Sequence, residues 1–242
     1  MSQPLSNQVA VITGASTGIG RAAAVALAEA GADMILAARS AAELEETARQ
    51  VRAAGRRALV QVTDVADETQ VQALMARAVD ELGRIDILVN NAGTNARGPV
   101  EGLSLEGWQR TLGVNATGAF LCAREALPAM RRQGGKIINV VSGRGVQGGA
   151  GSPAYAASKF AMRGLSQSLA EEVRDDNITV SCVLPGPTDT PLRRSGHPHE
   201  DRSLLLAPED VAEVIVFLAT RPANVVISEV PVRPRRYFSG IA

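Results

Sequence analysis

Three residues in the second half of the chain have the types and spacing of an acid–base site. Ser142 ends an apolar segment, and Tyr155 and Lys159 follow it at positions i and i+4 of one another. Ser152 and Pro153 are typical of a helix start, so the tyrosine and lysine would rise from one helical face. A phenol titrates near pH 10, so its use near neutrality requires roughly 4 kcal/mol of phenolate stabilisation, which a neighbouring ammonium can supply. Any helix can carry such a pair, so the interpretation depends on the rest of the chain.

A glycine-rich turn near the N-terminus has the context of a phosphate-binding loop. Residues 8–13 predict a short buried strand, and residues 21–30 predict an alanine-rich helix. The turn between them carries Gly14, Gly18 and Gly20 in a GxxxGxG spacing. Glycines here permit a tight turn, let backbone N–H groups approach a pyrophosphate and let the helix pack close to the sheet. A purely structural strand-to-helix turn is the alternative.

The end of the second predicted strand indicates which dinucleotide would bind. Residues 34–38 form this strand and residues 41–54 the next helix, so Arg39 lies where an adenosine ribose would sit. A carboxylate at this point would bind the two ribose hydroxyls, whereas a guanidinium can bind a 2′-phosphate. Arg39 therefore favours NADP(H) over NAD(H). NAD(H) is the alternative, because Arg39 could be a solvated residue at a helix entrance and Thr17 adds no second basic group.

Strands and helices alternate along the remaining chain. Further strands are predicted over residues 58–63, 85–89, 136–141, 178–184 and 224–232, and further helices over residues 68–82, 104–130, 153–174 and 208–218. This alternation predicts an α/β fold whose parallel sheet is covered by helices on both faces and binds ligands at the carboxyl ends of its strands. Asp64, Asn91 and Ser142 all follow such strand ends. Asp64 would cap the next turn or accept a hydrogen bond from an adenine.

A polar residue interrupts the long helix predicted over residues 104–130. Asn115 lies between Gly113 and Gly118 in an otherwise apolar stretch, which indicates a local bulge in the helical hydrogen-bond ladder. Helical bulges are frequent at functional sites. Asn115 is therefore a candidate site residue.

Composition disfavours several other classes of function. The chain has 242 residues, of which 45% are hydrophobic, and this suits a single α/β domain. Its 25 basic and 25 acidic residues cancel, so no overall field would attract nucleic acid or an anionic membrane. No segment has the features of a membrane span or a signal peptide. Cys122 and Cys182 stand in apolar surroundings without a ligand or disulfide pattern, so we expect buried free thiols in a cytoplasmic protein.

The C-terminal third contains two polar segments. Residues 188–206 are irregular and contain prolines, and we expect a flap over the substrate there. The HPHED run at residues 197–201 does not indicate a metal site, because a proline separates its histidines and no third ligand cluster supports it. Arg233, Arg235 and Arg236 are expected to form a solvated tail rather than a nucleic-acid site, since no aromatic stripe accompanies them.

Taken together, these motifs resemble the short-chain dehydrogenase/reductase family in its single-domain form. The likeness covers roughly residues 9–190 and rests on TGASTGIG at residues 13–20, NNAG at residues 90–93, YAASK at residues 155–159, Asn115 and Ser142, in the family's order. The resemblance implies a Rossmann-type, doubly wound sheet of about seven parallel strands in three α/β/α layers. It also implies an enzyme that transfers a hydride between a nicotinamide and a carbonyl or secondary alcohol carbon.

The resemblance also implies a role for each matching residue. Tyr155 would be the acid–base group, Ser142 would donate a hydrogen bond to the reacting oxygen, and Lys159 would lower the tyrosine pKa and bind the nicotinamide ribose. The backbone carbonyl of Asn115 would connect Lys159 to solvent through water. The positions implied to bind the dinucleotide are Gly14, Ser16, Thr17, Gly18, Ile19, Arg39, Asp64, Val65, Asn91, Ala92, Gly93, Tyr155, Lys159, Pro185, Gly186, Thr188 and Thr190.

Three questions stay open at the level of the sequence. Family members are commonly homo-oligomers, but the C-terminal VVISEVPVRP lacks the family's usual glycine-rich ending, so both a homodimer and a homotetramer are considered. The substrate would be a small molecule; Arg97 and Arg144 suit a polar or anionic one, although Arg144 could equally form an ion pair with a neighbour. A dinucleotide-sensing protein without catalysis is the functional alternative, which the complete acid–base set disfavours.

Overall fold

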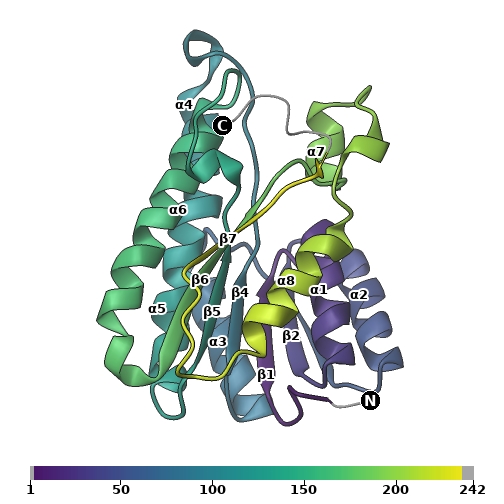
Figure 1. The fold of residues 1–242 in the computed structure, drawn as a ribbon, viewed down its shortest axis with the longest axis vertical. Coiled ribbons are helices and arrows are strands. Elements are labelled where there is room, and N and C mark those ends of the chain that lie inside the picture. Colours follow the sequence, from purple (N-terminus) through teal and green to yellow (C-terminus); the bar gives the residue numbers. More distant parts are fainter. Residues whose placement is uncertain (1–2, 236–242) are drawn as a thin grey trace.

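The computed structural model describes residues 3–235 and contains one continuous sheet (Figure 1). Its strands are β1 (Val9–Thr13), β2 (Asp33–Ala38), β3 (Ala58–Val62), β4 (Ile87–Asn90), β5 (Gly135–Val140), β6 (Ile178–Pro185) and β7 (Glu229–Val232). Within residues 3–235 these seven strands pair in parallel in the order β3-β2-β1-β4-β5-β6-β7. The strand order reverses beside β1, which confirms the expected doubly wound, Rossmann-type sheet.

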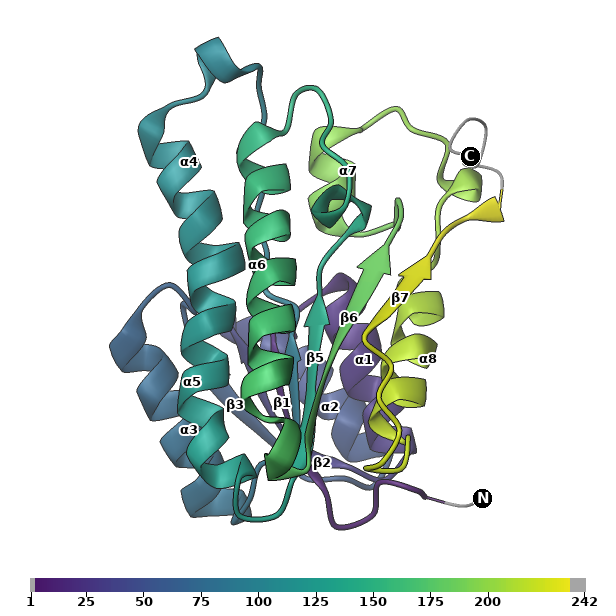
Figure 2. The same ribbon diagram turned by 60° about the vertical axis from the view of Figure 1, so that its left-hand side comes forward.

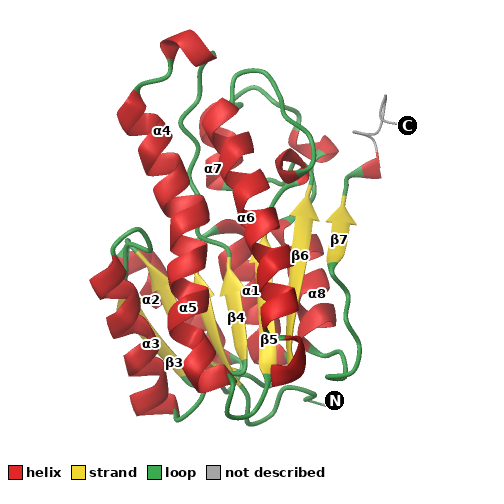
Figure 3. Cartoon of the chain, turned by 90° about the vertical axis from the view of Figure 1, so that its left-hand side faces the viewer, coloured by secondary structure: helices red, strands yellow, loops and turns green. Residues whose placement is uncertain are grey.

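Helices cover both faces of this sheet and complete three layers. They are α1 (Gly18–Glu29), α2 (Ala41–Ala53), α3 (Glu68–Leu82), α4 (Leu105–Leu112), α5 (Gly118–Met130), α6 (Pro153–Glu172), α7 (Pro191–Gly196) and α8 (Pro208–Ala219). Helices α1, α2 and α8 pack on one face, and α3, α5 and α6 pack on the other (Figures 2 and 3). Helix α4 extends the line of α5 beyond the carboxyl edge of the sheet (Figure 3).

Alternate residues of the central strands β1 and β2 belong to two different apolar cores. In β1, Ile12 lies in the core beneath α1 and α8, whereas Val11 lies in the core beneath α3 and α5. In β2, Leu36 and Ile35 divide in the same way. Burial of each such side chain contributes about 1.5–3 kcal/mol. The central residues of β1 and β2 are therefore apolar on both sides of the sheet, because helices cover both faces.

The carboxyl ends of β1 and β4 are joined by one threonine. The Thr13 hydroxyl donates to the Val89 carbonyl at 3.3 Å and accepts from the N–H groups of Asn91 and Ala92, each at 3.1 Å. Thr13 is buried, so these bonds lie out of water. The loops that follow the two strands are thus held at a fixed separation.

The interruption predicted at Asn115 is a π-helical turn, Gly113–Thr117, between α4 and α5. The fully buried Asn115 amide donates to the Thr94 carbonyl at 3.0 Å and to the Ser158 hydroxyl at 2.9 Å, and its Oδ1 accepts from the Thr94 N–H at 2.8 Å. The bulge therefore joins three segments: the helix itself, the loop after β4 and α6.

The segment at residues 188–206, expected to be irregular, contains the short helix α7. The Thr190 hydroxyl accepts from the Arg193 N–H at 3.2 Å, and Pro191 occupies the first helical turn. A threonine cap followed by proline is a recognised helix start. This local signal was present in the sequence, and only its short length hid the helix.

The last strand is shorter than expected. It begins at Glu229 rather than at Asn224, because the Val225 N–H donates to the Pro222 carbonyl at 3.0 Å and turns the chain before it reaches β6. Only residues 229–232 then pair with β6.

Several other expectations can be compared with the described residues. Cys122 and Cys182 are buried and free, as expected. Among residues 3–235 no helix is both long enough and apolar enough to cross a bilayer. The same residues contain no group of three or more His, Cys, Asp or Glu arranged to hold a metal ion. Arg236, assigned to the expected tail, lies outside the described residues.

Candidate active site

A cleft of about 900 Å³ runs along the carboxyl edge of the sheet. The predicted site residues that line it are Gly14, Ser16, Thr17, Gly18, Ile19, Arg39, Asp64, Val65, Asn91, Ala92, Gly93, Ser142, Tyr155, Lys159, Pro185, Gly186, Thr188 and Thr190. Folding therefore brings together positions that are spread from β1 to the start of α7. Asn115 is the exception, because it lies fully buried behind the cleft wall.

Ser142 and Tyr155 face the cleft from the end of β5 and from the first turn of α6. The Ser142 Oγ accepts from the Arg144 N–H at 3.1 Å, so the hydroxyl proton can be donated to another oxygen. Burial raises the pKa of Tyr155, whereas hydrogen bonding with Ser142 and the charges of Arg97, Arg193 and Arg144 oppose that rise. The phenol therefore carries its proton near neutral pH in this structure.

Lys159 lies one helical turn after Tyr155 and is only 3% exposed. Its Nζ donates to the Val140 carbonyl at 2.8 Å, lies 3.7 Å from the Met162 Sδ and lies 5.7 Å from the centre of the Tyr155 ring. Burial lowers the pKa of Lys159 to about 8, and Cys182 opposes this weakly. The ammonium is thus held by a strand-end carbonyl, and its expected effect on the tyrosine stays a prediction.

Asn115 approaches the cleft from behind the same wall as Lys159. A Cβ added to Gly93 would lie 3.6 Å from the Asn115 Oδ1 and 4.0 Å from the Lys159 Nζ. The two side chains therefore converge on one point beneath Gly93. The Asn115 amide itself is used to hold Thr94 and Ser158, which leaves the backbone of the π-helical turn for any relay.

The glycine-rich turn after β1 has the shape that a phosphate needs. Gly14 and Gly18 have φ of +64° and +54°, a region that favours glycine, and a Cβ at Gly20 would lie 2.2 Å from the Gly14 carbonyl oxygen. Asn91 donates from Nδ2 to that carbonyl at 3.1 Å, which holds the turn. Helix α1 begins without a side-chain cap from Thr17, so its first N–H groups are available to an anion.

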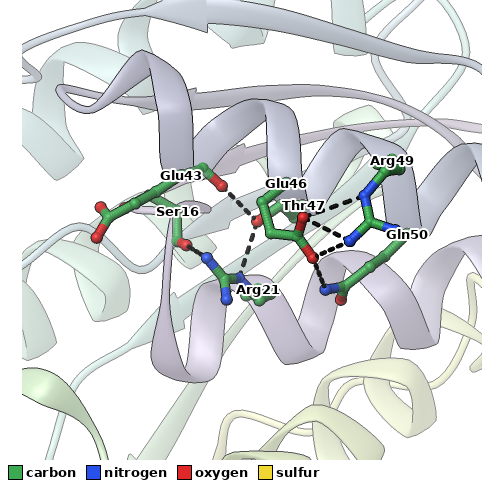
Figure 4. A network of polar contacts seen from close by, with 7 residues as sticks. All are labelled: Ser16, Arg21, Glu43, Glu46, Thr47, Arg49 and Gln50. Atoms are coloured by element: carbon green, nitrogen blue, oxygen red, sulfur yellow. Dashed lines mark hydrogen bonds and ion pairs between the residues drawn. The ribbon is translucent and has the colours of Figure 1, made fainter.

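Two polar residues that the sequence analysis did not identify support this turn from behind (Figure 4). Arg21 donates from Nη2 to the Ser16 carbonyl and from Nε to the Thr47 hydroxyl at 3.1 Å. The Thr47 hydroxyl lies 3.0 Å from the Ala15 carbonyl and 3.1 Å from the Glu43 carbonyl. Thr47 in α2 is fully buried, so the phosphate loop is tied to a neighbouring helix.

The far end of the cleft is formed by the segments after β2 and β3. Arg39 is exposed there, and Ser40 stands at the N-cap position of α2 without a side-chain capping bond. Glu43 lines the same end and adds a negative charge. Asp64 accepts from the Ala66 N–H at 3.1 Å, so the capping use of this carboxylate is present in the structure.

The flap segment, residues 188–206, starts and ends at one point. Thr188 and Leu206 form a parallel bridge, and the Asp189 N–H donates to the Leu206 carbonyl at 2.9 Å. Farther along the segment, the His197 Nε2 lies 3.0 Å from the Arg97 Nη1 in the loop after β4. The flap is thus pinned at its base and touches the opposite wall of the cleft.

Arg233, assigned to a solvated tail, is exposed as expected, and it also lies in the lining of the cleft together with Pro234. The reason is the course of the chain after β7, since a Cβ added to Gly186 would lie 3.0 Å from the Pro234 Cδ and 3.5 Å from the Arg233 Cα. The C-terminal segment therefore passes directly over the strand end that bears Gly186.

With this geometry in place, comparison with known proteins is decisive. A family model described as short chain dehydrogenase matches residues 8–201. The chain belongs to the short-chain dehydrogenase family. It is 40% identical over 242 residues to cis-4-hydroxycyclohexanecarboxylate dehydrogenase of Sinomonas cyclohexanicum, a match that covers 95% of this chain and 96% of the relative.

Solved structures of other short-chain dehydrogenases have the same fold. A metagenomic short-chain oxidoreductase in complex with NADP is 37% identical, with a TM-score of 0.85 and coverage of 96% of this chain and 98% of the other. A short chain dehydrogenase from Mycobacterium paratuberculosis bound to NAD is 30% identical, with a TM-score of 0.87 and the same coverage. This short-chain dehydrogenase is therefore an oxidoreductase for alcohol or carbonyl groups, and both neighbours support a nicotinamide dinucleotide as its cofactor.

Proposed function

We propose that the chain is an NADP(H)-dependent oxidoreductase that transfers a hydride between the nicotinamide and a carbonyl or secondary alcohol carbon. The observation that carries this proposal is the convergence of Ser142 and Tyr155 at one end of a cleft whose other end has a glycine cradle. Lys159 lines the same cleft, and Asn115 lies buried behind its wall. NAD(H) dependence of the same reaction is the alternative.

Ser142 and Tyr155 are proposed to act on the reacting oxygen. The bound nicotinamide supplies or accepts the hydride. In reduction, the Tyr155 hydroxyl gives its proton to the carbonyl oxygen as the carbonyl carbon gains the hydride; in oxidation, the phenolate takes the hydroxyl proton as the carbon loses the hydride. Ser142 donates its hydrogen bond to the same oxygen, where negative charge develops. The raised pKa of Tyr155 keeps the phenol protonated at neutral pH, the form that the reduction requires.

Lys159 and Asn115 are proposed to return the proton. A lysine with a pKa of about 8 exchanges protons readily near neutrality, unlike an ordinary lysine. Its position beside Tyr155 and beneath Gly93 supports proton transfer between the phenol and the π-helical turn at Asn115, toward the phenol after reduction and away from it after oxidation. Lys159, which lines the cleft, would also bind the nicotinamide ribose.

The residues present fit a dinucleotide along the whole cleft. Gly14 lets the turn after β1 pack closely against the loop after β4, since a Cβ at Gly14 would lie 2.8 Å from the Ala92 Cα. We propose that the positions around this turn hold the phosphates and that those after β6 hold the carboxamide. The proposed contacts are Gly14, Ser16, Thr17, Gly18 and Ile19 for the phosphates, Asp64 and Val65 for the adenine, Asn91, Ala92 and Gly93 for the ribose, and Pro185, Gly186, Thr188 and Thr190 for the carboxamide.

The preference for NADP(H) depends on the start of α2. Arg39 and the uncapped Ser40 together offer a guanidinium, a hydroxyl and free helix N–H groups to a 2′-phosphate. Glu43 opposes this preference through its negative charge. Fluorescence titration with NADPH and NADH in parallel tests the balance. Tighter binding of NADH by the unmodified protein would show that the NAD(H) alternative is correct.

A matched pair of variants sharpens this test. Arg39→Ala is expected to weaken NADPH binding roughly 10- to 100-fold, the value of a hydrogen bond to a charged group, and to leave NADH binding unchanged. Arg49→Ala is the control, because this exposed arginine of α2, the helix that follows Arg39, pairs with Glu46 at 2.6 Å and does not line the cleft (Figure 4). Equal losses for both cofactors would refute the role of Arg39.

Two further features are proposed on the same basis. We propose that the chain forms a single domain in which residues 188–206 act as a flap, supported by the pinned base and the contact between His197 and Arg97. We also propose a homodimer or homotetramer, supported by Phe120 on α5 and Phe160 on α6, which are 43% and 44% exposed. Light scattering of the unmodified protein and of Phe160→Asp would report the assembly directly.

Tyr155→Phe tests the catalytic assignment. Loss of the hydroxyl is expected to lower kcat about 100- to 10,000-fold on any secondary alcohol or ketone that the protein uses, with cofactor binding retained. Ser152→Ala is the control, since this serine also lines the cleft but contributes only a 3.4 Å contact with the Asn95 amide. Full turnover by Tyr155→Phe would overturn the assignment. Tight cofactor binding without hydride transfer by the unmodified protein would instead favour a sensing protein.

A further inference from the structure

The substrate end of the cleft is positively charged. Beyond Tyr155 its wall carries the guanidinium groups of Arg97 and Arg144, with Arg193 close by. Glu43 and Asp64 are the acidic residues among the described lining, and both belong to the adenosine end, in α2 and after β3. A neutral substrate would leave this concentration of positive charge uncompensated.

Among the described residues, Arg97 and Arg144 have no carboxylate partner. Within residues 3–235, Arg144 donates to the Gly148 carbonyl at 2.6 Å, Arg97 contacts the His197 ring at 3.0 Å, and neither forms an ion pair. The ion pair that the sequence allowed for Arg144 is therefore not formed in the described part of the chain. Each guanidinium has five N–H donors, so most of them remain available.

The neighbouring flap shows the contrast. Arg193 pairs with Glu200 at 2.5 Å, and Arg194 pairs with Asp189 at 2.7 Å. These arginines of α7 are neutralised by carboxylates of their own segment. Arg97 and Arg144, across the cleft, are not neutralised in this way within residues 3–235. They nevertheless stand only a few residues after the NNAG loop and after Ser142.

The two guanidinium groups pack against glycine backbone. A Cβ added to Gly149 would lie 2.1 Å from the Arg144 Nη1, and one added to Gly196 would lie 2.0 Å from the Arg97 Cζ. The Gly98 N–H donates to the Gly151 carbonyl at 3.0 Å, and this hydrogen bond joins the two loops that carry the arginines. The cations are thus partly ordered before any ligand binds, which lowers the entropic cost of binding.

Both arginines also lie within electrostatic reach of the reacting oxygen. Their charges, with that of Arg193, oppose the rise in the pKa of Tyr155 that burial causes. An anionic group bound to Arg97 and Arg144 would therefore lie close to the carbon beside Tyr155 rather than at a remote surface.

We propose that Arg97 and Arg144 form a carboxylate-binding subsite, and that the substrate is a hydroxy acid or keto acid whose alcohol or carbonyl carbon lies beside Ser142 and Tyr155. A guanidinium matches the two oxygens of a planar carboxylate with parallel N–H donors. Use of the bound acid as a substrate rests on the proposed function. Binding of the carboxylate depends on the two arginines alone, so the two ideas can be tested separately.

Calorimetric titration of the enzyme saturated with the oxidised form of its tighter-binding dinucleotide, which cannot reduce a ketone, measures the subsite directly. The probes are 3-oxobutanoate, 4-oxopentanoate and 4-oxocyclohexanecarboxylate, each compared with its methyl ester, which keeps the ketone and removes the charge. At least one acid is expected to bind about tenfold or more tightly than its ester. Equal binding of acid and ester throughout, or no binding of any acid at millimolar concentration, overturns the proposal. So does tighter binding of dihydroxyacetone phosphate than of every carboxylate, since it indicates a phosphate site.

Variants identify the groups responsible. Arg97→Gln and Arg144→Gln are each expected to weaken acid binding about tenfold or more and to change ester binding less than about threefold. Arg194→Gln removes a positive charge from the flap outside the cleft lining and is expected to leave both unchanged. Equal losses for acid and ester, or an equal effect of Arg194→Gln, would show a general charge effect and contradict the subsite.

Charge-preserving variants give a second and independent readout. Gly149→Ala and Gly196→Ala would move the guanidinium groups without removing them, and are expected to weaken acid binding while thermal unfolding changes little. Unchanged acid binding in both variants would contradict the argument that the positions of the two guanidinium groups against glycine contribute to carboxylate binding. Tyr155→Phe is expected to bind the acids normally and not to reduce them. Normal acid binding with no reduction by the unmodified enzyme would refute the proposed function and leave the subsite intact.

Discussion

Lys159→Met is expected to stabilise the fold while it removes activity. Lys159 is 3% exposed, and burial lowers the pKa of its ammonium from 10.5 to about 8. This difference corresponds to roughly 3 kcal/mol of unfavourable free energy for burying the charged form. Methionine has a similar length and no charge, so it removes that cost but leaves the Val140 carbonyl without its donor, a loss of about 1 kcal/mol. The expected net gain in the free energy of unfolding is about 2 kcal/mol at neutral pH.

The gain should depend on pH in one direction. Below about pH 8, Lys159 is protonated in both the folded and the unfolded protein, so the unmodified chain bears the full cost and the variant has its full advantage. Between pH 8 and 10.5 the folded state releases this proton while the unfolded state keeps it. The stability of the unmodified protein then rises with pH relative to the variant, and the difference between them closes.

Denaturant unfolding of both proteins across this pH range measures the difference between their free energies of unfolding. The contributions of other titrating groups are the same in both proteins and cancel in this difference. A melting temperature about 4–8 °C higher for the variant near pH 7 is the corresponding thermal result. Lys136→Met is the control. Lys136 is the only other lysine of the sequence, it lies half-buried in β5, and burial lowers its pKa as well. Its replacement is therefore expected to stabilise the protein in the same direction but by less. A variant that is less stable than the unmodified protein at pH 7, or a difference that does not change with pH, would refute this account of Lys159.

Three other predictions concern groups outside the acid–base set. Thr47→Val should raise KM for the dinucleotide severalfold with little change in kcat, because the Ala15 carbonyl of the phosphate loop loses its donor; an unchanged KM would contradict the supporting role. Gly20→Ala should abolish cofactor binding and lower the melting temperature, since its Cβ would lie 2.2 Å from the Gly14 oxygen, and normal binding by titration would exclude this clash. The Cys122 thiol, whose pKa burial raises to about 12, should react with iodoacetamide only when denaturant unfolds the chain, as mass spectrometry can show.

Local sequence signals were sufficient where a helix or strand carries its own boundaries. Helix α3 was predicted over its full length, because the Asp67 side chain accepts from the Gln70 N–H at its start and Gly83, with φ of +83°, ends it. The π-helical turn at Asn115 was likewise visible as a polar residue between glycines. In α7 the local signal was present but short, whereas the bounds of β7 were decided by its pairing with β6.

The amino-acid sequence by itself determined the order of strands and helices, the glycine turn and the Ser142, Tyr155 and Lys159 set, because each depends on residues close to one another along the chain. Only the tertiary structure decided how these groups behave. The lowered pKa of Lys159 comes from burial, and the support of the phosphate loop comes from Thr47 in a neighbouring helix. Folding likewise decides which arginines pair with a carboxylate, as Arg193 and Arg194 do. Dielectric surroundings and contacts between distant segments exist only once the chain is packed, and no local pattern encodes them.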